Sequence, residues 1–187
     1  MELVTTSIPG LLVLRPSRAT DERGFFSETY RRSFMEEHGL PVEWVQDNHS
    51  LSRRRGTVRG LHFQVPPRAQ AKLVRVVVGR VFDVAVDLRR ASPSYGRHAA
   101  FELSAAGGEQ LLVPVACAHG FCTLEDDTEV LYKVSEYYSP DHDRGLRWDD
   151  PALGITWPVT AAEAVLSARD RQHPPLAALP DYFAEGA

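Results

Sequence analysis

Two of the seven histidines lie in short apolar segments beside a phenylalanine, where an imidazole could move protons. His62 stands in Arg-Gly-Leu-His-Phe-Gln (59–64), and His119 stands in Ala-His-Gly-Phe (118–121). Histidine suits general acid–base chemistry because its ordinary pKa is near neutrality. On the local sequence alone, a core histidine whose hydrogen bonds are satisfied is the better interpretation of either. The other five, His38, His49, His98, His142 and His173, have polar or proline-rich neighbours and are predicted to be exposed.

The sequence does not predict a metal site around these histidines. A small β-barrel would need two histidines two residues apart on one strand, with a Glu a few positions further on. Position 64 is Gln, so His62 lacks such a partner, and Cys117 with His119 gives only a pair. Among the carboxylates, Asp170 lies in Ser-Ala-Arg-Asp-Arg (167–171), where a single Asp is ordinarily a turn residue.

Two tyrosines and one lysine offer an acid and a cation. If 130–138 forms one strand, Tyr132 and Tyr138 share a face. They could fill a core with satisfied hydroxyls, or serve as an acid and a stacking platform, and spacing alone does not choose. Of 21 basic residues only Lys72 and Lys133 are lysines, which singles out these two positions.

Composition indicates an ordinary globular protein, predicted to be one domain over residues 1–187. The net charge of -4 leaves no basic excess, so nucleic acid is not an expected partner. The apolar run Leu11 to Leu14 is too short for a signal peptide or a membrane span, so we expect no membrane association. The protein is therefore predicted to be cytoplasmic, with Cys117 and Cys122 as reduced thiols.

The elements that must position these side chains are mainly short strands. Helical periodicity is confined to residues 29–38, which end at Gly39 with Pro41 just beyond. The fold class is predicted to be all-β, a sandwich or barrel, with an irregular Pro-rich tail after Trp148 that wraps it. The strand-like runs are 42–45, 57–63, 72–78, 81–88, 99–103, 110–113, 120–124 and 130–138.

Two local features of these strands matter for the candidate residues. The link Gly79-Arg80 predicts that the strands before and after it pair as a hairpin. Strict alternation also puts Arg59 and His62 on opposite faces, so a bulge or bend at Gly60 is needed if both are to face one pocket.

Eight segments, in this order along the chain, resemble the nucleotide-sugar 3,5-epimerases typified by dTDP-4-dehydrorhamnose 3,5-epimerase. The resemblance covers about Asp21 to Asp170, and the order of the motifs makes it specific. The motifs are DERGFF (21–26), QDNHS (46–50), RGLHFQ (59–64), KLVR (72–75), AHGF (118–121), YYSP (137–140), WDDP (148–151) and SARD (167–170).

The resemblance implies a jelly-roll barrel of the cupin type, a homodimer, and catalysis without a metal or an organic cofactor. The implied substrate is a dTDP-4-keto-6-deoxy-hexose, whose C3 and C5 hydrogens flank the C4 ketone. By the matching motifs, His62 would be the base with Asp170 as its partner, Tyr132 the acid on the opposite sugar face, and Lys72 the cation at the enolate oxygen. Substrate contacts would come from Arg23, Glu28, Gln46, Asp47, Asn48, Arg59, His119, Tyr138, Asp143 and Arg169.

The chemistry of proton removal beside a ketone agrees with these roles. Such a site needs a base of near-neutral pKa and a cation aimed at the carbonyl oxygen, and inversion needs a proton from the other face. The family pattern differs here at two positions, because Asp143 replaces a usual Glu and Arg169 replaces a usual Lys. Both keep their charge, so we expect each to keep its role with altered reach.

Two other classes of function compete with an epimerase that inverts C3, C5 or both. A metal-dependent cupin enzyme is disfavoured by the missing ligand set. A non-catalytic nucleotide-sugar binding module is possible on the same scaffold, but it would not need His62, Tyr132, Lys72 and Asp170 together. The sequence leaves open whether one or two centres are inverted, as in single-centre epimerases of antibiotic-sugar pathways.

Overall fold

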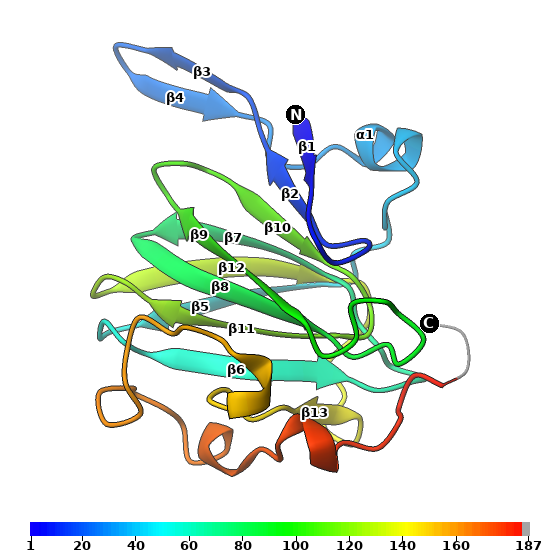
Figure 1. The fold of residues 1–187 in the computed structure, drawn as a ribbon. Helices are drawn as coiled ribbons and strands as arrows, with labels where there is room; N and C mark the ends of the chain where they lie inside the picture. The colour runs from blue at the N-terminus through cyan, green and yellow to red at the C-terminus, as the bar shows by residue number, and fades with distance from the viewer. Residues whose placement is uncertain (185–187) are drawn as a thin grey trace.

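Strands with alternating inward and outward side chains assemble into two antiparallel sheets in the computed structural model, which describes residues 1–184 (Figure 1). One sheet has the order β1 (Glu2–Thr5), β2 (Leu12–Arg15), β10 (Gln110–Val113), β7 (Lys72–Val78), β12 (Thr128–Val134) and β5 (Gln46–Ser52). The other has the order β13 (Asp143–Gly145), β6 (Val58–Gln64), β11 (Cys117–Thr123), β8 (Arg80–Asp87) and β9 (His98–Ser104). A separate hairpin, β3 (Arg18–Asp21) with β4 (Gly24–Ser27), projects from the body.

The two large sheets enclose an aliphatic core. Val74, Val76 and Val130 of the six-stranded sheet meet Ala85 and Phe121 of the five-stranded sheet, and all five are buried. Burying each such valine contributes roughly 1.5–3 kcal/mol relative to its exposure to water, so this core is the main stabilising layer. The predicted all-β jelly-roll class, with one short helix and a wrapping tail, is confirmed. The last three residues of the predicted 1–187 unit lie outside the described part of the chain.

The hairpin predicted at Gly79 is wrong. β7 pairs with β10 and β12 in one sheet, whereas β8 pairs with β11 and β9 in the other. One residue, Gly79 at φ +77, carries the chain from sheet to sheet, which is too short a link for a two-residue hairpin loop. A Cβ on Gly79 would lie 2.6 Å from Thr128 Oγ1, so the corner also needs a residue without a side chain.

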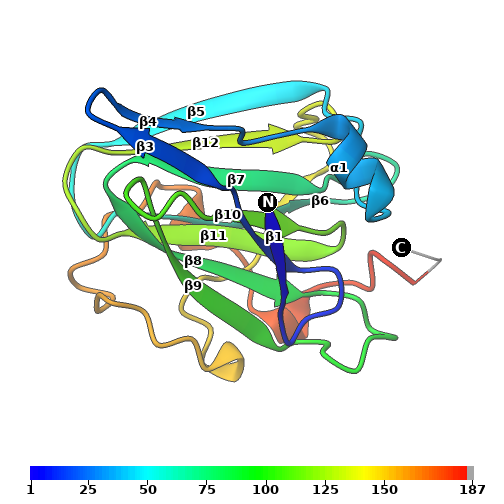
Figure 2. The same cartoon turned by 90° about the horizontal axis from the view of Figure 1, so that it is seen from above.

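Several predicted boundaries shift. The helix α1 covers only Arg32–Glu37, and residues 42–45 form no strand. The strand after them, β5, was not predicted, and β12 ends at Val134, which leaves Tyr138 on the following loop. Figure 2, from above, shows α1 and the C-terminal end toward the same end of the sandwich, as in Figure 1. No helix in residues 1–184 is long and apolar enough to cross a membrane.

The tail wraps the five-stranded sheet as predicted. It contains three short 3-10 turns, at Pro151–Leu153, Asp170–Gln172 and Leu176–Ala178. Near its end, Tyr182 and Phe183 pack on Phe63 of β6. The tail thereby brings Asp170 beside β6, far from it in sequence.

The expected irregularity at Gly60 is present. His119 faces His62 across the β11–β6 ladder and Phe121 faces Arg59, so β6 has one residue more than β11 between these pairs. Gly60 has φ +138, and a Cβ there would lie 2.6 Å from Gly120 Cα. The bulge shifts the alternation by one residue, and both Arg59 and His62 line the same hollow.

Candidate active site

Two adjoining hollows, of about 120 and 280 Å³, lie between the sheets and share His62, Lys72 and Tyr132 in their walls. His62 comes from β6 of the five-stranded sheet, while Lys72 and Tyr132 come from β7 and β12 of the six-stranded sheet. The sandwich therefore presents an imidazole on one wall and an ammonium and a phenol on the other. The aliphatic core between the two sheets holds these walls in place.

His62 is paired with the carboxylate brought in by the tail. Its Nε2 lies 2.7 Å from Asp170 Oδ1, and because a carboxylate can only accept, this nitrogen carries the hydrogen. The hydrogen bond leaves Nδ1 as the lone-pair nitrogen. Burial lowers the pKa of His62 more than Asp170 raises it, so the ring is neutral at neutral pH and can accept a proton.

Asp170 is buried and ionised. Burial alone would raise the pKa of its carboxyl group, but the close contacts and charge of His173 and His62 lower it further than burial raises it. The backbone N–H of Asp170 donates to Ser167 Oγ over 3.0 Å, which fixes the turn that carries it. Its special role has no local sequence signal, because the carboxylate becomes partnered only when the tail docks on β6.

Lys72 supplies a buried cation. Its Nζ donates to the backbone oxygen of His62 over 3.1 Å, which ties the two walls together. Burial lowers the pKa of Lys72 to about 8, although Asp143 and Asp83 oppose the shift. The ammonium is therefore charged at neutral pH and close to its own titration.

Tyr132 keeps its phenolic proton. Burial raises the pKa of this phenol, with Arg59 opposing the shift and Asp143 adding to it. A protonated hydroxyl on the wall opposite His62 is able to donate a proton into the hollow. The alternative of a core tyrosine with a satisfied hydroxyl does not hold, because Tyr132 lines both hollows and its hydroxyl makes no hydrogen bond among the described residues.

Two arginines and a histidine lie together in the larger hollow. Arg59, His119 and Arg169 line it together with Asp170. Arg59 is held by Ser52 Oγ at 3.0 Å and the Leu51 oxygen at 3.1 Å. His119 Nε2 lies 2.9 and 3.1 Å from the two oxygens of buried Asp83, so His119 is also a carboxylate-bound imidazole. This side of the site suits an anionic group such as a diphosphate.

The smaller hollow is lined by Gln46, Asn48, Tyr138 and Asp143. Gln46 Nε2 donates to Asn48 Oδ1 over 2.8 Å, and Gln46 Oε1 accepts the backbone N–H of Tyr138 over 3.1 Å. Buried Gln64, which sequence reasoning noted only as a missing metal ligand, bonds the backbone of Tyr137 and Ser139. Gln64 therefore positions the loop that presents the half-exposed ring of Tyr138.

The two departures from the family pattern contact each other. Arg169 lies 2.7 Å from Asp143 Oδ2 in an ion pair at the edge of the site. This pairing raises the pKa of Arg169, and Tyr138 adds to the effect. Asp143 has a shorter side chain than the usual Glu, and Arg169 has a longer side chain than the usual Lys. The two opposite charges can therefore still form an ion pair.

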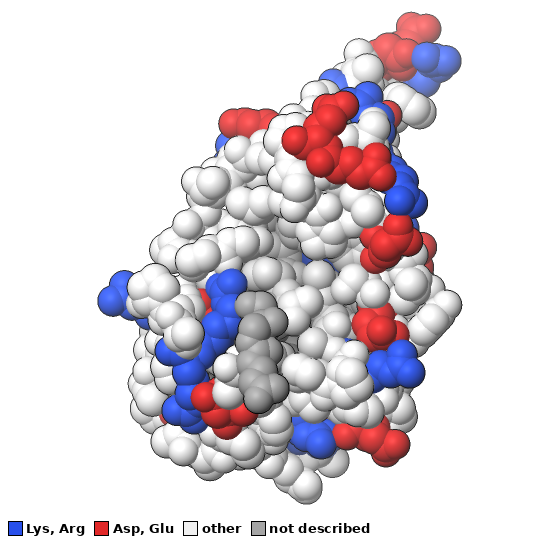
Figure 3. Space-filling view, turned by 90° about the vertical axis from the view of Figure 1, so that its right-hand side faces the viewer, with Lys and Arg blue, Asp and Glu red and all other residues white. Residues whose placement is uncertain are grey.

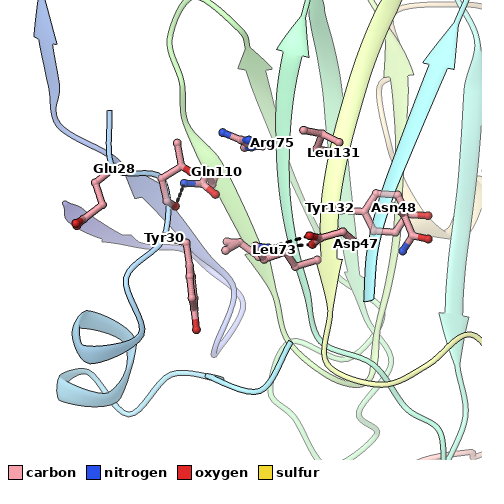
Figure 4. A pocket seen from close by; sticks show the side chains of 11 residues that line it. Glu28, Tyr30, Asp47, Asn48, Leu73, Arg75, Gln110, Leu131 and Tyr132 are labelled. Atoms are coloured by element: carbon pink, nitrogen blue, oxygen red, sulfur yellow. Dashed lines mark hydrogen bonds and ion pairs between the residues drawn. The ribbon is translucent and has the colours of Figure 1, made fainter. Parts of the chain in front are cut away.

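Three predicted residues lie away from His62. Arg23 is at the tip of the β3–β4 hairpin, 84% exposed and bound to Asp21. Glu28 and Asp47 line a different hollow of about 370 Å³, between the segment after β4 and the outer face of the six-stranded sheet (Figure 4). Asp47 pairs there with Lys133 at 3.0 Å. Strand alternation explains its outward position, because Gln46 and Asn48 on either side face inward.

Three of the histidines predicted to be exposed are partly buried. His98 Nδ1 lies 2.8 Å from the Leu153 oxygen and His142 Nδ1 lies 2.8 Å from Ser139 Oγ, while His38 and His49 are exposed as expected. His173, whose side chain is only 9% exposed, lies against Asp170. Its polar, proline-rich sequence context gave no sign of this contact.

Within residues 1–184, His62, Asp170 and His173 form a group whose ligand atoms lie within 4.8 Å of one another, close enough to hold a metal ion. The short hydrogen bond from His62 to Asp170 already uses one ligand atom of each. A neutral imidazole backed by a carboxylate, a buried ammonium and a protonated phenol can together remove a proton beside a carbonyl and return one from the other side. We therefore interpret the cluster as an acid–base group.

Comparisons with known proteins give the same family. The family model described as dTDP-4-dehydrorhamnose 3,5-epimerase matches residues 5–178. The dTDP-4-dehydrorhamnose 3,5-epimerase of Sinorhizobium fredii is 50% identical over 183 residues, covering 98% of this chain and 93% of the relative.

Two solved structures have a fold similar to that of this chain. The Bacillus anthracis dTDP-4-dehydrorhamnose 3,5-epimerase with TDP and PPi bound has a TM-score of 0.90 at 47% identity, covering 93% of this chain and 98% of that one. The Legionella pneumophila dTDP-6-deoxy-D-glucose-3,5-epimerase in complex with dTDP-4-keto-L-rhamnose has a TM-score of 0.90 at 37% identity, covering 96% and 94%. Sequence, fold and the grouping of acid–base side chains agree, and this chain is an epimerase of the dTDP-4-dehydrorhamnose 3,5-epimerase family.

Proposed function

We propose that this epimerase inverts both C3 and C5 of a dTDP-4-keto-6-deoxy-hexose, with the sugar held between the two sheets. The observation that carries the proposal is the placement of His62 and Tyr132 on opposite walls of one hollow, with Lys72 beside them. A sugar nucleotide of this kind, dTDP-4-keto-L-rhamnose, is bound in the similar Legionella pneumophila structure. A mechanism of this class needs no group beyond these side chains.

The first half of each inversion is proton removal. His62 Nδ1 takes the hydrogen from the carbon beside the C4 ketone, the C–H electron pair moves into the ring, and the carbonyl oxygen becomes an enolate. The Lys72 ammonium stabilises that oxygen, because a compact point charge fits one developing negative atom. Asp170 stabilises the resulting imidazolium and fixes the tautomer of His62.

The second half is proton return. Tyr132 donates its hydroxyl proton to the opposite face of the same carbon as the enolate reverts to the ketone. His62 is then protonated and Tyr132 is a phenolate, so one proton must pass from the imidazolium to the phenolate before the next inversion. C3 and C5 both flank the ketone, so one set of groups can act on each in turn.

The nucleotide would occupy the remaining polar surface. Arg59, His119 and Arg169 are proposed to hold the diphosphate and neighbouring sugar oxygens, and Tyr138 to stack on the base. Gln46, Asn48 and Asp143 are proposed to orient the sugar and the Tyr138 loop. Figure 3 shows acidic and basic residues interspersed on the face that it presents, unlike the basic surface that is typical of nucleic-acid binding.

We also propose a cytoplasmic homodimer. The β3–β4 hairpin projects from the body of the molecule (Figure 1). Phe25 and Phe26 on this hairpin are 62% and 78% exposed, an apolar surface that a second copy would cover. In such a dimer Arg23 and Glu28 would serve the partner's substrate, since Arg23 lies away from His62 of its own chain. Cys117 and Cys122 are buried free thiols, which supports a reducing compartment.

Replacing Tyr132 with Phe should separate proton removal from inversion. His62 and Lys72 can still form the enolate, but the proton would return mainly from His62, on the original face. We expect epimer formation to fall roughly 10²–10⁴-fold while deuterium from deuterated water still enters C3 and C5 of recovered substrate. Mass spectrometry and proton NMR of that substrate measure both rates and show whether one or two carbons exchange.

His62→Ala is the matched control and should lose both exchange and inversion. If Tyr132→Phe inverts at close to the wild-type rate, Tyr132 is not the acid. If it loses exchange as fully as His62→Ala does, the tyrosine is needed to form the enolate and the division of labour is wrong.

The pH profile should report the titration of Lys72. The pKa of Lys72 is lowered to about 8, so its stabilising charge is present below that pH and is lost as pH rises through it. We expect kcat/KM of the wild type to fall above pH about 8, and Lys72→Gln to lose this basic limb together with most of its activity. A wild-type profile that stays flat to pH 10 would remove the Lys72 charge from the mechanism.

The homodimer is tested by sedimentation equilibrium at micromolar concentration. The wild type should have twice the chain mass of 20.8 kDa, and the double variant Phe25→Ser with Phe26→Ser should have a weakened association and an unchanged circular dichroism spectrum. A wild type that sediments only as a single chain contradicts the dimer and the proposed role of Arg23.

A further inference from the structure

The His173 ring fills a slot beside the His62–Asp170 pair. Its Nε2 lies 3.5 Å from Asp170 Oδ1, the same oxygen that binds His62 Nε2 at 2.7 Å. The two imidazoles meet edge to face, with centroids 5.5 Å apart and planes at 83°. One carboxylate oxygen is therefore approached by two histidines.

The chain builds this slot from a distant strand. Gly145 of β13 lies directly opposite His62 in the β13–β6 ladder. A Cβ on Gly145 would lie 2.2–2.3 Å from the Cε1, Nδ1 and Nε2 atoms of His173, so the ring occupies the space that a side chain would need. The backbone N–H of Arg147 donates to the Pro174 oxygen over 2.8 Å and anchors the segment that carries the ring.

The buried Nε2 of His173 has no hydrogen-bond partner among the described residues, and Asp170 Oδ1 is the acceptor that it approaches. A carboxylate oxygen offers only lone pairs, so the favourable neutral tautomer of His173 carries its hydrogen on this nitrogen. His173 lines neither of the hollows assigned to the substrate. It lines an outer hollow of about 400 Å³, on the other side of Asp170, with Arg147 and Arg171.

We propose that His173 is a positioning residue for the catalytic base: its N–H shares the Asp170 carboxylate with His62, and its ring seals the outer side of that carboxylate. The inference rests on the proposed role of His62. With His173 in place, part of the negative charge of Asp170 is offset by a second donor. Asp170 then orients His62 without stabilising its protonated form so strongly that the ring stops acting as a base near neutrality.

The groups that surround His62 set the sign of the expected effect. Burial lowers its pKa and the Asp170 carboxylate raises it. Removing the second donor leaves the carboxylate charge to His62 alone, so the pKa of His62 should rise. Several charged or titratable groups face His62 from the packed elements. They are Asp170, His173, Lys72, Asp143, His119, Tyr132, Arg59 and Arg169.

The direct test is an NMR titration of ¹⁵N-histidine-labelled protein without substrate. His173→Leu keeps the bulk of the ring but not the donor, and His173→Gln keeps an N–H donor. We expect the pKa of His62 to rise by roughly half a unit or more in His173→Leu and to return toward the wild-type value in His173→Gln. Since no substrate is present, this readout is independent of whether the proposed sugar and roles are correct.

Kinetics give the second readout. In His173→Leu the acidic limb of kcat/KM should move to higher pH by the same amount, with KM changed little because His173 does not line the substrate hollows. Gly145→Ala should reproduce both effects, because the added methyl group displaces the ring without altering Asp170. Gly145→Ala therefore also tests the proposal if the His173→Leu variant does not fold.

An unchanged or lowered pKa of His62 in the folded variants overturns the proposal. Loss of activity with an unchanged His62 titration overturns it as well, since the ring would then be only a packing element.

Discussion

The geometry of the site depends on the contacts that the buried carboxylate of Asp170 makes with two histidines. Asp170 is withdrawn from water, and an isolated ionised carboxylate in that position would cost several kcal/mol. His62 at 2.7 Å and His173 at 3.5 Å offset that cost, and in doing so they fix the tail against β6. The interaction that docks the tail is thus the one that orients His62, the proposed base.

The two-sheet architecture turns this pair into a two-sided site. His62 comes from one sheet, while Lys72 and Tyr132 come from the other. In the proposed mechanism, a sugar ring held between them meets the base on one face and the acid on the other. The Gly60 bulge brings Arg59 to the same side as His62. Its close approach to Gly120 requires two glycines, one on each strand. The catalytic geometry therefore follows from packed strands, which place side chains more rigidly than loops do.

Alternation along strands predicted much of this arrangement. The bounds of β7 and β10 were predicted correctly, and the conflict between Arg59 and His62 correctly required a bulge at Gly60. The same rule would have placed Asp47 outside, since Gln46 and Asn48 flank it, but the strand β5 was not recognised. The family resemblance brought Asp170 to attention before the structure located it.

Other features depend on tertiary contacts that no local pattern encodes. Glycine is typical of a hairpin turn, yet the strands before and after Gly79 pair with other strands in two different sheets. His173 has an unremarkable context, and its burial becomes evident only when Gly145 is seen opposite His62. The Asp143–Arg169 pair likewise joins a residue of β13 to a residue of the tail. That the shorter and the longer side chain compensate for each other is evident only from the fold.

In the proposed mechanism the His62–Asp170 pair removes the proton from the sugar. This step is tested by the rate at which the Asp170→Asn variant incorporates deuterium from deuterated water into the sugar. Asparagine keeps the shape but does not stabilise an imidazolium, and it can reverse the tautomer of His62. We expect the rate of deuterium exchange at both C3 and C5 to be roughly 10²–10⁴-fold lower than in the wild type across pH 6 to 9, in a variant that remains folded. Exchange close to the wild-type rate over that range would contradict it.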